Sequence, residues 1–208
     1  MQRLVSRDLS AALHSEAMLL ADGDVAIDAG VGRADGRTRD QFIRRSRIHW
    51  IDGATVAQRR FLRLAESLRQ ALNSRLFLGL FEFEAQLALY QPQGFYARHL
   101  DSFQGARNRV VSLVTYFNEE WADGDGGELL IWSRAPDGGG PDGGGIGPPD
   151  VIVRPEAGTL VLMLSEEIPH EVAPSRRSRA SIAGWWRVNT PSGASSGASS
   201  RALIDPAT

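Results

Sequence analysis

The sequence contains no cysteine, and all 23 residues in its Lys+Arg count are arginine, so lysine is missing as well. Without cysteine the chain has no disulfide bond, no cysteine-ligated iron–sulfur cluster and no thiol nucleophile. Without lysine it cannot form a Schiff base or use a phosphate-loop lysine, and a buried carboxylate must be held by arginine. The formal net charge of -2 provides no field for nucleic acid or an acidic membrane.

Long hydrophobic runs are missing too. The first twenty residues contain acidic side chains and no uninterrupted apolar stretch, and no later run approaches membrane-spanning length. A chain of 208 residues, 42% hydrophobic and 23% charged, is typical of one ordinary globular domain. We therefore expect a single cytoplasmic domain without a nucleic-acid or membrane partner.

The hydrophobic periodicity changes along the chain. Apolar residues recur at helical spacing over residues 9–20 and, more clearly, over residues 54–72. From residue 81 apolar and polar residues alternate as in a strand that leads into Tyr90, and further β-rich runs occupy residues 109–116, 128–132, 151–153, 159–164 and 181–188. Short strands separated by Gly, Pro and Asp clusters indicate a mostly β protein whose core is an antiparallel double-sheet jelly roll.

These patterns suggest how the domain is organised. We expect residues 1–80 to form a helical support region that is integral to the domain, and residues 81–189 to form the cupin-like jelly-roll core, a double-stranded β-helix. Residues 134–150 (RAPDGGGPDGGGIGPPD) are so rich in glycine and proline that they predict a flexible hairpin loop between two strands. Residues 190–208, which are rich in Ser, Gly and Ala, predict a flexible tail.

The strongest chemical signal is the tripeptide His99-Leu100-Asp101 combined with His170. Alternate residues of a strand point to the same side, so His99 and Asp101 on a strand would aim at one point. Two imidazoles and one carboxylate on one face of Fe(II) leave adjacent positions open for substrates, although zinc also accepts these ligands. The simpler alternative is that His170, which follows Pro169, is a core histidine.

Arg179 favours the iron interpretation because it lies nine residues after His170. A guanidinium holds a carboxylate through two parallel hydrogen bonds, which suits an anionic co-substrate beside a metal. Ser181 is two residues further on and would share the strand face of Arg179, where its hydroxyl could donate to the same carboxylate. Arg176 and Arg177 are nearer in sequence, but they follow Pro174 and are expected in a solvated turn.

In this combination of motifs the chain resembles the iron(II)/2-oxoglutarate-dependent dioxygenases, within them the branch of prolyl 4-hydroxylases, oxygen-sensing prolyl hydroxylases and bacterial relatives. The resemblance extends in order from about residue 40 to residue 188. Its segments are Ile43-Arg44, residues 48–53 (IHWIDG), residues 90–101 (YQPQGFYARHLD), residues 108–118, residues 126–129 (GGEL), residues 158–160 (GTL) and residues 170–186.

The resemblance implies roles for individual residues. It implies Fe(II) bound by His99, Asp101 and His170, 2-oxoglutarate anchored by Arg179, dioxygen as second co-substrate, and ascorbate as a reductant. It also implies contacts around 2-oxoglutarate from the side chains of Tyr90, Ser181 and Leu129, with Tyr96 and Trp185 lining the cavity. The alternative is a purely structural role, as a buried tyrosine for Tyr90 and as core packing for Tyr96, Leu129 and Trp185. No catalytic side chain beyond the iron ligands is predicted.

Two departures from the oxygen sensors stand out. Thr115 replaces what we interpret as a second tyrosine of their co-substrate pocket, and Ser46 replaces an acidic residue in the loop 44–47. The departure at Thr115 leaves open which residues contact the inner part of 2-oxoglutarate. The second predicts different docking of the substrate.

The reaction implied by the resemblance is hydroxylation of a C–H bond with release of succinate and carbon dioxide. We expect the target to be a prolyl residue in a protein substrate. Two alternatives stay open: hydroxylation of a free amino acid or other small molecule, and a sensor module that binds metal and 2-oxoglutarate without turnover. Succinate production in the absence of a prime substrate would separate the sensor from the enzymes.

Overall fold

The computed structural model describes residues 5–21, 27–28, 43–102, 109–133 and 147–188. Its two helices are α1 (Arg7–Leu19) and α2 (Val56–Leu76). The Thr55 side chain caps α2 by accepting a hydrogen bond from the Gln58 backbone nitrogen at 3.1 Å. Both helices bury the apolar side predicted from the sequence, including Leu13 of α1 and Phe61 of α2.

The strands form two antiparallel sheets. The six-stranded sheet has the order β1-β2-β3-β10-β5-β8, and the four-stranded sheet has the order β4-β9-β6-β7. The strands of the larger sheet are β1 (Ile27–Asp28), β2 (Arg47–Trp50), β3 (Leu80–Tyr90), β5 (Arg109–Tyr116), β8 (Leu160–Leu164) and β10 (Arg179–Val188). Those of the smaller sheet are β4 (Tyr96–His99), β6 (Leu129–Ile131), β7 (Val151–Val153) and β9 (His170–Val172).

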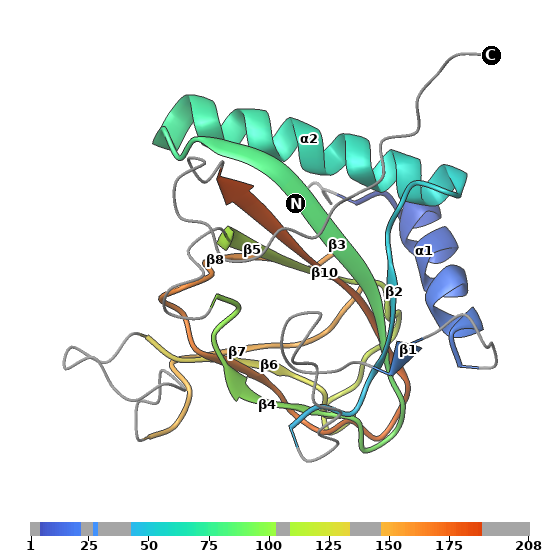
Figure 1. The fold of residues 1–208 in the computed structure, drawn as a ribbon. Helices are drawn as coiled ribbons and strands as arrows, with labels where there is room; N and C mark the ends of the chain where they lie inside the picture. Colours follow the sequence, from blue (N-terminus) through green and yellow to red (C-terminus); the bar gives the residue numbers. More distant parts are fainter. Residues whose placement is uncertain (1–4, 22–26, 29–42, 103–108, 134–146, 189–208) are drawn as a thin grey trace.

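The two sheets face each other, and the helices cover the outer face of the larger sheet (Figure 1). This arrangement is the predicted mostly β jelly roll with supporting helices. One hydrophobic core lies between the helices and the large sheet, and a second lies between the two sheets. The candidate site is built in the second, inner space.

Strand β10 runs through the middle of the large sheet and contributes to both cores. Its residues alternate: Ala180, Ile182 and Trp186 belong to the core beneath the helices. Arg179 and Ser181 therefore point to the inner space between the sheets. Pairing with β3 on one side and β5 on the other holds β10 in register over most of its length.

Strands β6 and β7 pair antiparallel, so residues 134–150 connect two neighbouring strands as predicted. The described ends of this connection are tied together, because Trp132 Nε1 donates to the Gly147 carbonyl at 3.1 Å and the Ser133 nitrogen donates to Asp150 Oδ2 at 2.6 Å. The predicted flexibility of the loop concerns mainly residues 134–146, and that of the tail concerns residues 190–208. Both segments lie outside the described residues.

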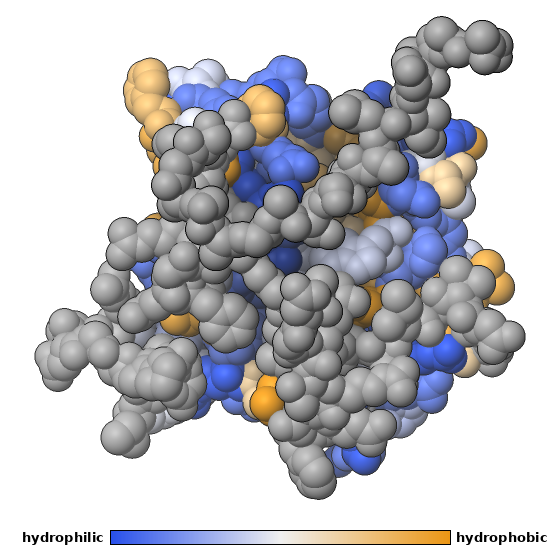
Figure 2. All heavy atoms as spheres, viewed as in Figure 1, coloured by the Kyte–Doolittle hydropathy of each residue, from blue (hydrophilic) through white to orange (hydrophobic). Residues whose placement is uncertain are grey.

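Hydrophilic residues dominate the described surface on the face shown in Figure 2, where hydrophobic residues form separate spots. Within the described ranges, no helix combines the length and apolar character that crossing a membrane requires.

Candidate active site

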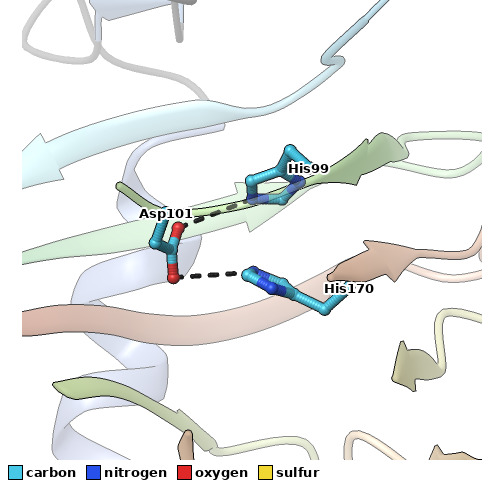
Figure 3. Close-up of side chains that lie close together, drawn as sticks. All are labelled: His99, Asp101 and His170. Atoms are coloured by element: carbon cyan, nitrogen blue, oxygen red, sulfur yellow. Dashed lines mark ion pairs between the residues drawn. The ribbon is translucent and has the colours of Figure 1, made fainter. Parts of the chain in front are cut away.

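His99, Asp101 and His170 come together between the sheets, as predicted (Figure 3). One ligand atom from each side chain lies within 4.8 Å of the others. His99 ends β4 and His170 begins β9, and these two residues are partners in the antiparallel pair. Asp101 follows β4 in a bend, so the tripeptide is not entirely on a strand, although both of its side chains still meet.

The hydrogen bonds of the two imidazoles leave their inner nitrogens free to bind a cation. His99 Nδ1 lies 2.8 Å from the Ala97 carbonyl oxygen, and His170 Nδ1 lies 3.0 Å from the Ile168 carbonyl oxygen. A carbonyl can only accept, so each Nδ1 carries the proton and each Nε2 carries a lone pair in the neutral ring. These Nε2 atoms lie 3.5 Å from Asp101 Oδ1 and Oδ2 respectively. Lone pairs converging on one point suit a metal ion.

Burial and neighbouring groups set the protonation of the triad. Burial lowers the pKa of His170 to about 4, and His99 acts in the same direction, so the ring is neutral at pH 7. Burial alone would raise the pKa of Asp101, but His170, His99 and the Ser112 hydroxyl together lower it below its usual range. A neutral imidazole and an ionised carboxylate are the forms that bind metal.

Arg179 lies at the start of β10 with its side chain buried, and its guanidinium is only partly engaged. Its Nε donates to the Gly127 carbonyl at 2.8 Å, and its Nη1 donates to Ser181 Oγ at 3.3 Å. The remaining nitrogen, Nη2, is buried without a hydrogen-bond partner among the described residues. A buried guanidinium nitrogen without a hydrogen-bond partner costs free energy unless an anion accepts from it. A co-substrate carboxylate would be such an acceptor.

Two tyrosines flank the guanidinium of Arg179. The arginine Cζ lies 5.0 Å from the centre of the Tyr90 ring and 4.9 Å from that of Tyr116. The Tyr116 hydroxyl is also buried without a partner among the described residues, and burial raises its pKa to about 12, which keeps it protonated as a donor. Tyr116 and Arg179 therefore offer two free donors in one pocket.

The assignment of Thr115 to the place of the second tyrosine is one position off, because Tyr116 and not Thr115 lies against Arg179. Thr115 Oγ1 donates to the Thr159 carbonyl at 2.9 Å, whereas Tyr116 faces Arg179. Adjacent residues of a strand point to opposite faces, so an error of one position exchanged the two roles. The alternation of Ser112, Val114 and Tyr116 along β5 was the signal that could have identified Tyr116.

The other predicted residues take definite places. Ser181 accepts the Arg179 bond, and Leu129 is fully buried in the inner core together with Tyr90. Tyr96 stacks on the His99 ring with 3.6 Å between ring centres. Arg176 and Arg177, the competitors of Arg179, are both exposed, and Arg177 pairs with Asp125 at 3.2 Å.

The opposite end of the inner face is charged. Trp185 is the partner of Ser112 across β10 and β5, and the Arg109 guanidinium lies 4.0 Å from its ring centre. Arg109 also pairs with Glu84 at 2.7 Å. Sequence reasoning missed this cluster, because ion pairs between distant strands carry no local sequence signal.

Comparisons with known proteins agree with this geometry. The family model described as the 2OG-Fe(II) oxygenase superfamily matches residues 85–187. A prolyl-4-hydroxylase from Pseudomonas putida is similar at 39% identity and a TM-score of 0.75, over 90% of this chain and 90% of that chain.

Two further solved structures share the fold at lower identity. One is a prolyl hydroxylase from Trichoplax adhaerens in complex with a hypoxia inducible factor oxygen degradation domain peptide fragment, with a TM-score of 0.74 and 22% identity over 90% of this chain and 81% of that chain. The other is a viral collagen prolyl hydroxylase from Paramecium Bursaria Chlorella virus-1 in a 2OG complex, with a TM-score of 0.58 and 16% identity over 91% of this chain and 94% of that chain.

The chain belongs to the 2OG-Fe(II) oxygenase superfamily, within the branch that contains the prolyl hydroxylases. It is a 2-oxoglutarate-dependent dioxygenase. Membership of this family implies Fe(II), 2-oxoglutarate and dioxygen, and the donor set of the triad and the free donor of Arg179 both fit that requirement.

Proposed function

We propose that this dioxygenase hydroxylates a prolyl residue in a protein or peptide substrate. The observation that carries the proposal is the 39% identity to a prolyl-4-hydroxylase over nine-tenths of both chains. In the proposed site, His99, Asp101 and His170 hold Fe(II). Iron bound there supplies the oxidising chemistry that couples decarboxylation of 2-oxoglutarate to succinate and carbon dioxide with hydroxylation of a C–H bond.

The protein orients the co-substrate. Arg179 Nη2 and the Tyr116 hydroxyl, the two free donors, hold the far carboxylate of 2-oxoglutarate, and Ser181 fixes the guanidinium. Tyr90 and Leu129 pack around the pocket and exclude water from it. Holding reactants in one geometry is the main contribution that residues of this kind make to the rate.

The far end of the inner face carries two further buried donors. Trp185 Nε1 and Arg187 Nε are buried donors without a partner among the described residues. Trp185 pairs with Ser112, which contacts Asp101, so these donors lie on the metal side of the inner face, away from Arg179. Carbonyl oxygens of a peptide would accept from these donors, and so would the carboxylate of a free amino acid, so the choice of a peptide rests on the similarity to prolyl hydroxylases.

The test uses the purified 208-residue chain with Fe(II), 2-oxoglutarate and air. We expect mass spectrometry of a host lysate treated with the enzyme to locate prolyl residues that are heavier by one oxygen atom. A synthetic peptide around such a site should be hydroxylated, and free L-proline should not. Oxidation of free proline without any peptide would favour the small-molecule alternative. If the protein binds 2-oxoglutarate but releases no succinate, the sensor alternative is favoured.

Ascorbate as the reductant and a cytoplasmic location remain predictions within this proposal. Omitting ascorbate should shorten the period of linear succinate release without changing the initial rate. Fractionation of host cells checks the location.

A further inference from the structure

A pair of buried serine hydroxyls supports the Asp101 carboxylate. Ser112 Oγ donates to Asp101 Oδ2 at 2.7 Å, and Ser165 Oγ lies 2.8 Å from Ser112 Oγ. Both serines are 1% exposed. They come from the neighbouring strands β5 and β8, Ser112 within β5 and Ser165 directly after β8. The contact therefore links the candidate metal ligand to the large sheet.

The direction of these hydrogen bonds follows from the chemistry of the groups. An ionised carboxylate only accepts, so the single hydroxyl proton of Ser112 points to Asp101. Ser165 must then donate to Ser112, because Ser112 has no second proton to give. The Ser165 backbone is itself fixed, since its nitrogen donates to the Val110 carbonyl at 3.0 Å and its carbonyl accepts from the Ser102 nitrogen at 3.2 Å.

The two oxygens of Asp101 are consequently not equivalent. Each oxygen lies 3.5 Å from one imidazole nitrogen, Oδ1 from His99 Nε2 and Oδ2 from His170 Nε2. Oδ2 also accepts the Ser112 bond, whereas Oδ1 receives no hydroxyl donor among the described residues. Arg109 is close enough to compete, but its Nη1 donates to the Asp101 backbone carbonyl at 3.3 Å and its other nitrogens pair with Glu84. Only Oδ1 keeps its lone pairs free of a strong hydroxyl bond.

We propose that Ser112, oriented by Ser165, is a positioning residue that restricts Asp101 to a single metal bond through Oδ1. The inference rests on the proposed function, in which the triad holds the metal. A metal held by three protein donors would keep open positions for its co-substrates. A carboxylate that bound through both oxygens would take up one of these positions. By holding Oδ2, the serine pair would leave that position open.

The test measures Co(II) binding under nitrogen, with visible absorption as a probe of coordination. Ser112→Ala should alter the Co(II) absorption spectrum of the 2-oxoglutarate complex and weaken Co(II) binding about 10- to 100-fold, as for other lost outer-shell partners. Ser112→Thr keeps the hydroxyl and should restore the parent spectrum. Ser165→Ala should shift the spectrum in the same direction by less. With Fe(II), Ser112→Ala should also raise the KM for dioxygen.

Thr115→Val is the matched control, because it removes a buried hydroxyl from the same strand that bonds to Thr159 instead of Asp101. It should leave the Co(II) spectrum unchanged. A parent-like spectrum and Kd for Ser112→Ala would overturn the inference and leave the proposed function standing. If Ser112→Ala does not fold, a parent-like spectrum for Ser165→Ala has the same meaning. Failure of the parent protein to bind Co(II) would overturn the metal assignment, and the serine role with it.

Discussion

Gly127 and Arg179 approach each other so closely that a side chain on the glycine would press against the arginine. The Gly127 carbonyl accepts from Arg179 Nε at 2.8 Å, and a Cβ at position 127 would lie 3.1 Å from Arg179 Cδ. The glycine thus both bonds to the guanidinium and leaves room for it. This contact fixes the direction in which Arg179 presents its free nitrogen.

Gly127→Ala should weaken 2-oxoglutarate binding and lower the Tm. The residue has a φ of +73°, and its new Cβ would also lie 2.9 Å from Ser175 Cβ. Gly124→Ala is the control, since Gly124 has a φ of +88° but no atom within 4 Å of its Cβ position. In both variants the positive φ of a non-glycine residue lowers the free energy of unfolding by about 1–2 kcal/mol. Only Gly127→Ala should change the 2-oxoglutarate Kd, measured by calorimetry, and equal Kd values for the two variants would contradict the packing argument.

Arg179→Ala should raise the 2-oxoglutarate Kd steeply. Losing a buried, charge-assisted pair costs on the order of 2–5 kcal/mol, which is at least about thirtyfold in Kd. Arg179→Lys should recover only part, because an ammonium lacks the planar fork. The exposed Arg176 provides the control, and Arg176→Ala should bind 2-oxoglutarate as the parent does. A similar loss in both alanine variants would mean that Arg179 is not the anchor.

Tyr116→Phe should separate the co-substrate role of the hydroxyl from its role in the fold. The hydroxyl is buried without a partner among the described residues, so its removal should leave the Tm of the ligand-free protein unchanged or raise it. Losing a hydrogen bond to a charged group costs roughly 1.5–3 kcal/mol, so the 2-oxoglutarate Kd should rise about tenfold or more. A lower Tm with an unchanged Kd would assign Tyr116 to the core alone.

His170→Ala should abolish metal-dependent succinate formation and leave the fold intact, because the two hydrophobic cores do not depend on the metal. Co(II) binding should weaken by more than about 100-fold, the upper value for outer-shell changes. Circular dichroism checks the fold. The control is His49→Ala, which changes a histidine of β2 that is adjacent to Ile48 and therefore points away from the inner face. Parent-like coupling of oxygen uptake to succinate in His170→Ala would contradict the metal assignment.

Much of the site could be predicted because its signals are local in sequence. His99 and Asp101 are two residues apart in the sequence, and Arg179 follows His170 by nine residues. These separations along the chain indicate which side chains belong to the site. The long alternating strand β3 and the amphipathic helix α2 were likewise predicted close to their observed bounds. Burial on one side of a long element leaves a periodic signal that is hard to miss.

The remainder depends on contacts between strands far apart in the chain. Strands β4 and β9 have four and three residues, too few for a reliable period, and β10 begins two residues earlier than expected. The assignment of Thr115 failed because one position decides the face of a strand. Ser165 has no recognisable motif, since its importance comes only from lying beside Ser112 in the folded sheet.

Because β10 lies in the middle of the large sheet, its two alternating sets of residues face different sides of that sheet. Its odd-numbered residues from Arg179 to Arg187 face the inner space, and its even-numbered residues face the helices, where Ile182 and Trp186 are fully buried. A complete substitution scan of this strand should therefore split by parity. Changes at even positions should reduce the amount of folded protein, and changes at odd positions should reduce what the folded protein can bind. No position in the middle of the strand is left to vary freely, so we expect natural variants of this enzyme to differ least there.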